Sequence, residues 1–263
     1  MDDRTEQIPR VLACDVGNTH VHLAQVTGQE VQGRQTLRLD EPQAMSEALA
    51  ALWQSQETSG VGKLAACSVN PPGLEALEAA SAATLEQQVL VVGRDLPLPI
   101  ETNLSHPAGI GTDRLCAAAA AYDHLGVACV VADFGSAVTI DCVDGQGVFQ
   151  GGAILPGLRM GATSLGAHTT QLPQVVPATP TWVFGRDTQE AIIGGLVYGA
   201  RGALRELVEA YATQLGHWPV VILTGGDARM ICEYPNKTGL VQAIVDNLVL
   251  CGVAIAYYKT LAR

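Results

Sequence analysis

Short apolar runs alternate with longer helix-like stretches along most of the chain. Runs of four to six residues rich in Val, Ile, Leu and Ala are typical of buried strands. We predict strands at Val11–Cys14, Val21–Val26, Leu64–Val69, Val89–Val92, Val127–Ala132, Val138–Val143 and Val220–Leu223. Stretches rich in Ala, Leu and Glu predict helices at Pro42–Trp53, Pro72–Gln88, Thr112–His124, Thr188–Gln214 and Leu240–Leu261. Strands that alternate with helices predict an α/β protein.

One strand–turn–strand pattern occurs twice, nearly half a chain apart. Asp15-Val16-Gly17-Asn18-Thr19 lies between two predicted strands, and so does Asp133-Phe134-Gly135-Ser136-Ala137. A short Asp-x-Gly recurs easily by chance, so the weight of this repeat lies in the matched strand context. It predicts two similar α/β lobes, residues 9–125 and 126–263, with a cleft between them.

Composition and charge narrow the choice of partner. The 263 residues are 48% hydrophobic and 16% charged, which indicates a large buried core. The net charge of −11 disfavours nucleic acid as a partner, because an acidic surface repels a phosphate backbone. The seven cysteines form no C-x-x-C pair and lie mostly in apolar runs, which predicts buried free thiols in a reducing compartment. No apolar run reaches the roughly 18 residues of a membrane span. The polar start resembles no signal peptide, so we expect a cytoplasmic protein without a membrane partner.

The first turn has the composition of a phosphate site. Gly17 lets the backbone bend close to a ligand, so that the amides of Gly17, Asn18 and Thr19 can converge on phosphate oxygens. Asp15, at the end of a strand, can hold Mg²⁺ directly or through water. An ordinary hairpin turn uses the same residue types and remains an equal alternative. The second turn has the same two interpretations. Its recurrence favours a phosphate or cation site, because ATP phosphates are held from both sides and bridged by a metal.

A third motif, Gly109-Ile110-Gly111-Thr112-Asp113-Arg114, follows Pro107 and opens a predicted helix. The free amides of a helix N-terminus suit an anion. Arg114 can pair with a substrate carboxylate, and Asp113 can accept a proton from an attacking hydroxyl. Alternatively, Thr112 or Asp113 only caps the helix. A dinucleotide-binding fingerprint is excluded, because the third glycine and a directly preceding strand are missing.

Glycines mark further segments of interest. Gly151–Gly157 is either a loop that lines a cleft or the exit of a strand, and Thr224-Gly225-Gly226 would let a nucleotide base or ribose approach. Gly195 and Gly199, one helical turn apart, predict close helix packing, and a contact between subunits at these glycines stays open from the sequence. Asp187 is the expected cap of the helix from Thr188, with Glu190 as its capping-box partner.

Together these motifs resemble those of type III pantothenate kinases, over about Val11 to about Tyr257. The resemblance lies in D-x-G-N-T, P-x-x-[VI]-G-x-D-R, D-x-G-[TS]-A-x-T-x-D, G-G-x-I-x-P-G and a late T-G-G. It implies a two-lobed, actin-like ATPase fold of the ribonuclease H-like kind, usually a homodimer. The implied activity transfers the ATP γ-phosphate to pantothenate, in the first step of coenzyme A synthesis. Mg²⁺ and a monovalent cation, K⁺ or NH₄⁺, are implied as cofactors.

The resemblance also implies roles for single residues. Those expected to bind ATP are Asp15, Val16, Gly17, Asn18, Thr19 and Ser136, with Asp15 also holding Mg²⁺. Those expected to bind pantothenate are Gly111, Thr112, Arg114 and Thr188, with Asp113 as the base. Asp133 would hold the monovalent cation.

Two positions depart from the family pattern. Leu104 stands three residues before Pro107, where the family often has a tyrosine, so any contact through a phenol is lost or replaced. Ser136 replaces the usual threonine and keeps the hydroxyl.

Two other functions stay open from the sequence. Proteins named as transcriptional accessory factors share the resemblance, which would make the chain a non-enzymatic regulator. The net charge disfavours direct DNA contact, and carboxylates at three motif turns, Asp15, Asp113 and Asp133, favour catalysis. The chain could also be another small-molecule kinase of the same fold, but a sugar kinase does not need an arginine beside its base.

Overall fold

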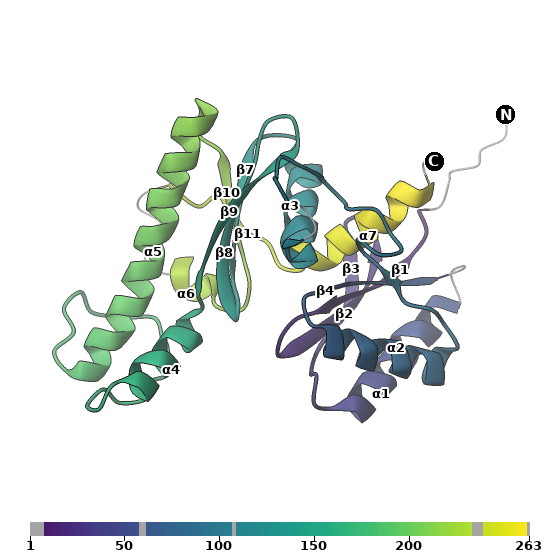
Figure 1. The fold of residues 1–263 in the computed structure, drawn as a ribbon, viewed down its shortest axis with the longest axis horizontal. Coiled ribbons are helices and arrows are strands. Elements are labelled where there is room, and N and C mark those ends of the chain that lie inside the picture. Colours follow the sequence, from purple (N-terminus) through teal and green to yellow (C-terminus); the bar gives the residue numbers. More distant parts are fainter. Residues whose placement is uncertain (1–7, 58–61, 107–108, 233–238, 262–263) are drawn as a thin grey trace. The chain divides into compact units, whose positions relative to one another are not determined.

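The computed structural model describes residues 8–57, 62–106, 109–232 and 239–261 of an α/β protein with two sheets (Figure 1). Internal contacts divide the chain into two units. The first comprises Met1–Glu101, Ser105–Ala120 and Asn247–Arg263, and the second comprises Thr102–Leu104 and Ala121–Asp246. Among the described residues, none of the helices has the length and apolar content that a membrane crossing requires.

The sheet of the first unit has five strands in the order β3-β2-β1-β4-β5. They are β1 (Val11–Val16), β2 (His20–Thr27), β3 (Glu30–Arg38), β4 (Lys63–Ser68) and β5 (Leu90–Val91). The first three form an antiparallel meander, whereas β4 and β5 run parallel to β1. The central strand β1 therefore has an antiparallel neighbour on one side and a parallel neighbour on the other.

Alternating side chains of β1 supply two separate cores, one on each face of this sheet. Leu12, Cys14 and Val16 pack with α1 (Pro42–Glu57) and α2 (Pro71–Leu85). Val11 and Ala13 pack on the other face with α7 (Leu248–Leu261), and Figure 1 shows α7 on the side of this sheet opposite α1 and α2. All five side chains are fully buried. A strand buried on both faces needs an uninterrupted apolar run, which is the pattern seen here.

The sheet of the second unit has the order β11-β10-β7-β8-β9-β6. Its strands are β6 (Glu101–Thr102), β7 (Cys129–Phe134), β8 (Ala137–Val143), β9 (Val148–Pro156), β10 (Val220–Thr224) and β11 (Ala243–Ile244). β7, β8 and β9 form an antiparallel meander, and β10 and β11 are parallel to β7. Apart from β6, both order and directions repeat those of the first unit. The predicted duplication is therefore confirmed in the sheet topology.

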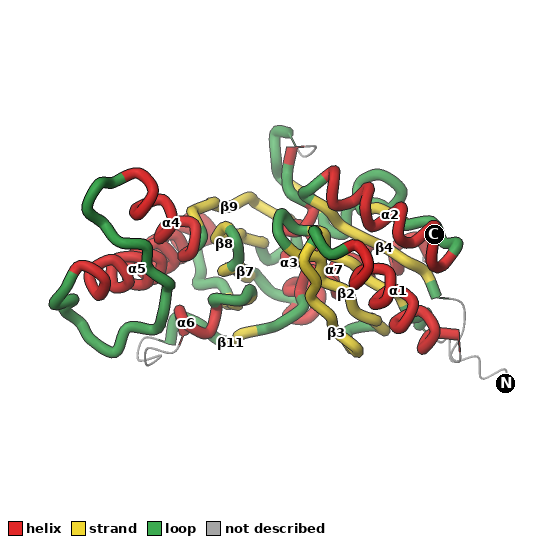
Figure 2. The backbone as a smooth tube through the Cα atoms, turned by 90° about the horizontal axis from the view of Figure 1, so that it is seen from below, coloured by secondary structure: helices red, strands yellow, loops and turns green. Residues whose placement is uncertain are grey.

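Helices of the second unit cover the face of β7 that carries Val130, Ala132 and Phe134. They are α4 (Leu158–His168), α5 (Thr188–Leu215) and α6 (Ala228–Cys232). α4 and α5 lie side by side in both views (Figure 2). Asp187 caps α5 as predicted, through a 2.8 Å bond from the Glu190 N–H. The Glu190 carboxylate instead accepts from the N–H of Arg186, one residue before the cap.

The remaining helix, α3 (Thr112–Leu125), begins where the sequence predicts. The structure differs from the predicted lobes 9–125 and 126–263 in its last segment, and also in two short ones, since Thr102–Leu104 and residues 121–125 belong to the second unit. The apolar face of α7 completes a core of the first unit, so residues 247–263 belong there. The helix predicted from Leu240 begins only at Leu248, because β11 precedes it. All seven cysteines are free and five are buried, as predicted.

Glycine positions give a mixed outcome. The segment Gly151–Gly157 is the end of β9 plus the N-cap of α4, which is the strand alternative. The close helix packing predicted for Gly195 and Gly199 is wrong within this chain, because a side chain at either position would point into open space. The close contact between helices is instead at Gly252 on α7, since a Cβ there would overlap the backbone of Cys116.

This close contact can be tested with two glycine-to-alanine changes in helices. Gly252→Ala should lower the free energy of unfolding by about 1–3 kcal/mol, because backbone cannot move aside as a side-chain end can. Gly195→Ala is the matched control and should raise it by up to about 1 kcal/mol through helix propensity. Urea denaturation measures both. Equal responses would contradict the close contact of α7 with α3.

Candidate functional site

The first turn joins β1 to β2, with Asp15 as the fifth of six residues in β1. The N–H of Gly17 donates to the carbonyl oxygen of His20 at 3.0 Å. The hairpin therefore uses one of the three amides predicted to meet phosphate, and the other two belong to the exposed residues Asn18 and Thr19. The Val16 side chain is fully buried, so only its backbone can meet a ligand.

Asp15 has a buried thiol as its neighbour on the parallel strand. Cys67 pairs with Asp15 in the β1–β4 register, and its Sγ donates to Oδ1 of Asp15 at 3.5 Å. A hydrogen bond with Cys116, burial and the negative charge of Asp15 raise the pKa of the Cys67 thiol well above its ordinary value. The thiol therefore stays protonated and remains a donor to the carboxylate.

The end of β4 also holds the start of α3. The Thr112 hydroxyl donates to the Ser68 carbonyl oxygen at 3.2 Å and accepts from the Ser68 N–H at 3.3 Å. This predicted substrate residue thus fastens α3 to the sheet through its hydroxyl. At Gly111 a Cβ would lie 3.1 Å from the Val69 side chain. Glycine therefore lets the backbone before α3 lie close to Val69. Pro107 lies outside the described residues.

Asp113 occupies the first turn of α3 as a partly buried carboxylate. Its Oδ1 accepts the backbone N–H of Arg114 at 2.8 Å. Burial raises the pKa of Asp113, and the Arg114 N–H and charge oppose this rise without cancelling it. A carboxylate with a raised pKa is a better proton acceptor than an exposed one. The negative charges of Asp113 and Asp15 both act on the Cys67 thiol, so the structure brings the two carboxylates to the same end of β4.

The second turn repeats the first with one residue fewer. Asp133 is again the fifth of six strand residues, and Gly135 N–H donates to the Ala137 carbonyl oxygen at 3.1 Å. The paired residues that flank the turn are Val16 and Val21 in the first unit, and Phe134 and Val138 in the second. In each of the two short hairpins, the first strand therefore carries an aspartate at the same position, just before the turn.

Two glycines allow other elements to crowd this second turn. Gly225, with φ of +92°, follows β10, and a Cβ there would overlap the Asp133 carboxylate and the Phe134 backbone. Gly157 caps α4, and a Cβ there would overlap the carbonyl groups of Gly135 and Ser136. Gly225 thus has a packing reason that the sequence did not reveal. Gly226 borders open space, which leaves room for the predicted ligand approach.

Sequence reasoning missed two charged residues near this turn. The N–H of Asp227 donates to the carbonyl oxygen of Phe134 at 2.9 Å. Burial raises the pKa of the Asp227 carboxyl, and the positive charge of Arg159 opposes that rise. Asp227 directly follows the T-G-G motif, which was the available signal. Of the predicted residues in this unit, Ser136 and Thr188 are both exposed.

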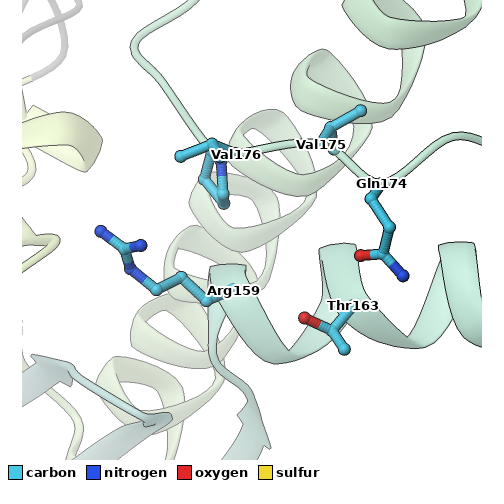
Figure 3. A pocket seen from close by; sticks show the side chains of 6 residues that line it. Arg159, Thr163, Gln174, Val175 and Val176 are labelled. Carbon is cyan, nitrogen blue, oxygen red and sulfur yellow. The ribbon is translucent and has the colours of Figure 1, made fainter.

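A pocket of about 290 Å³ lies in the second unit (Figure 3). Its lining residues are Arg159, Thr163, Gln174, Val175, Val176 and Pro177. The Arg159 side chain extends away from Thr163 and Gln174. None of the site residues predicted from the sequence lines this pocket, but Arg159, whose charge acts on Asp227, does.

Comparison with known proteins identifies the family. The family model for type III pantothenate kinase matches residues 11–210. The type III pantothenate kinase of Thermomicrobium roseum is 31% identical over 256 residues, which are 95% of this chain and 97% of that protein. The namesake from an Anaeromyxobacter species is 31% identical over 254 residues, 95% of this chain and 99% of that protein. The chain belongs to the type III pantothenate kinase family.

Solved structures agree on the fold of this pantothenate kinase family member. One is described as a conserved putative Baf family transcriptional activator from Campylobacter jejuni, with a TM-score of 0.61, 20% identity, and coverage of 96% of this chain and 100% of that one. MreB5 of Spiroplasma citri bound to ADP has a TM-score of 0.51 and 11% identity, with coverage of 97% and 98%. The predicted actin-like ATPase fold is confirmed.

The burial of Asp113 has a consequence for stability. Its folded-state pKa is raised, so the folded protein binds this proton more tightly than the unfolded chain does. The free energy of unfolding should therefore fall as pH rises through the folded-state pKa. At pH 7, Asp113→Asn should be at least as stable as the parent, and its advantage should shrink as pH falls toward about 4. Urea denaturation across this range measures it. A clear loss of stability at pH 7 would contradict the burial argument.

Proposed function

We propose that the chain phosphorylates pantothenate with ATP to give 4'-phosphopantothenate, the first step of coenzyme A biosynthesis. The chain belongs to the type III pantothenate kinase family, and one observation on its structure supports the proposal. The carboxylate of Asp113, whose pKa is raised by burial, lies beside Arg114 at the end of β4 that also holds Asp15. The substrate hydroxyl oxygen bonds to the γ-phosphorus, the bond from that phosphorus to the β,γ-bridging oxygen breaks, and ADP leaves. The hydroxyl proton passes to Asp113.

Binding of pantothenate falls to groups around the start of α3. The Arg114 guanidinium is the group that suits the pantothenate carboxylate, because arginine pairs with carboxylates through two parallel bonds. Gly111 offers backbone where a side chain would crowd Val69. The Thr112 hydroxyl already bonds Ser68, so this residue positions the helix. Thr188, exposed in the first turn of α5, is proposed to contact pantothenate as well.

ATP phosphates are proposed to meet the first turn through the amides of Asn18 and Thr19, with Ser136 offering its exposed hydroxyl. Asp15 fits Mg²⁺, because its carboxylate is a hard oxygen ligand at a strand end. When bound, Mg²⁺ neutralises phosphate charge that develops during transfer. The Cys67 thiol, which donates to Oδ1 of Asp15, orients this carboxylate.

Asp133 is proposed to hold a monovalent cation, K⁺ or NH₄⁺. Its carboxylate is a hard oxygen ligand, and the glycine at position 225 lets this carboxylate occupy a place that a Cβ would overlap. Activity should be low in Na⁺ and rise with K⁺ or NH₄⁺ at matched ionic strength. The rate of ADP release in the three chloride salts measures it, and equal rates would remove the cation role from Asp133.

The proposed setting is a cytoplasmic homodimer without nucleic acid or membrane as partner. Free cysteines fit a reducing compartment, and the net charge of −11 disfavours a nucleic-acid backbone. The family relationship supports the dimer. A non-enzymatic transcriptional role and a different small-molecule acceptor are the competing functions, and one assay separates all three.

That assay measures ADP release by the purified protein with ATP, Mg²⁺ and K⁺ against a panel of small hydroxy acids and sugars. Release with pantothenate supports the proposal. Release with a sugar alone would replace the substrate, and no release with any acceptor would favour the non-enzymatic role.

The role of Asp113 is tested by Asp113→Asn. Asn caps a helix about as well as Asp, so folding should be preserved. If Asp113 is the base, kcat at saturating substrates should fall by roughly 10²- to 10⁴-fold. A loss of less than about tenfold falls short of that range and would leave Asp113 as a cap.

Arg114→Ala should mainly raise the pantothenate KM, because it removes binding shared by the ground and transition states.

A further inference from the structure

The segment that follows β4 touches the first turn at several points. Val69 N–H donates to the Val16 carbonyl oxygen at 3.2 Å. The next residue, Asn70, reaches further, and its Nδ2 donates to the Gly17 carbonyl oxygen at 3.3 Å. Its Oδ1 accepts the N–H of Gly73 at 3.0 Å and so caps α2. One side chain therefore joins the turn to the start of a helix.

The bond to Gly17 acts on the amide that follows. A peptide group is planar and trans, so its carbonyl oxygen and the next N–H point in opposite directions. Asn70 holds the Gly17 carbonyl oxygen, which fixes the direction of the Asn18 N–H. The preceding peptide is also held, because its N–H, on Gly17, bonds His20. The turn thus has a fixed donor direction before any ligand arrives.

We propose that Asn70 is a positioning residue for nucleotide binding, which orients the Asn18 amide toward phosphate oxygens by holding the Gly17 carbonyl group. The proposal rests on the proposed function for the choice of ATP as the ligand. Donors fixed in advance bind a phosphate with less loss of conformational freedom than donors in a mobile turn. The effect should therefore appear in nucleotide affinity, and binding of pantothenate should not depend on it.

Asparagine is suited to this double task because its side chain carries both an acceptor and a donor. Aspartate and serine cap helices comparably, but neither has the amide donor. The second unit illustrates the difference. There the N–H of Asp227 bonds Phe134 as that of Val69 bonds Val16, but the residue that follows is Ala228 where the first unit has Asn70, and an alanine side chain has no donor for a carbonyl group. The amide brace is thus a device of the first turn.

The test separates the cap from the brace. Asn70→Ser and Asn70→Asp keep a cap and lose the amide donor, whereas Asn70→Ala loses both. We expect ATP affinity, measured by calorimetry without pantothenate, to fall about tenfold in the first two variants, as for loss of one hydrogen bond. Their melting temperatures should fall less than that of Asn70→Ala, which loses the cap as well and should drop by about 2–4 °C more. Asn103→Ser, which removes an exposed bond to Gln150, is the control and should bind ATP normally.

Several results would overturn the proposal. Parent-like ATP affinity in Asn70→Ser would do so, because a loss confined to Asn70→Asp reports charge repulsion rather than positioning. A fall in affinity that only parallels a fall in melting temperature would assign Asn70 to the cap alone. A parent protein that binds no ATP would end this inference and the proposed function together. A parent that binds ATP but leaves pantothenate unphosphorylated would sink the proposed function while the Asn70 comparison still stands.

Discussion

The parallel pairing of β1 with β4 is the constraint on which the first-unit site depends. In this register Asp15 lies opposite Cys67 and Val16 opposite Ser68. Ser68 in turn holds Thr112 at the start of α3, and the residues just beyond β4 hold the turn. Successive side chains point to opposite faces, so a slip of one residue would turn the thiol away from the carboxylate. The apolar alternation that fills two cores therefore also places the chemical groups.

Most of the fold could be predicted because its central strands are apolar on both faces. β1, β4, β7 and β10 were all found within two residues of their observed ends. β3 was missed, because most of its residues are exposed and polar. β9 was left open between a loop and a strand exit, because its glycines, Gly151 and Gly152, are typical of both. Gly152 is needed there, since a Cβ would overlap Asp141 and the neighbouring strand.

The residues of the candidate site could be chosen from the sequence by their type, whereas most of their contacts could not be predicted. Motif residues such as Asp15 and Asp113 stand out by their place at strand and helix ends. The partners of those residues are distant in sequence, so no local pattern could show that Thr112 bonds Ser68 or that the Gly17 amide closes its own hairpin. Asn70 precedes Pro71 and Pro72, a combination that indicates only a helix start. Its second bond, to Gly17, appears only in the folded chain.

Because α7 packs in the first unit, this unit needs both the beginning and the end of the chain, which are synthesised at different times. During synthesis, β1, β2 and β4 emerge early, yet one face of their sheet stays uncovered until residues 248–261 follow. All of the second-unit strands and helices are made in between. The first unit therefore finishes last, and a ribosome that stops before α7 releases a protein in which Val11, Ala13 and Ala24 lack the α7 side chains that pack on them. Such an apolar surface is what chaperones and proteases bind, so we expect a chain that ends before α7 to be held by chaperones or degraded.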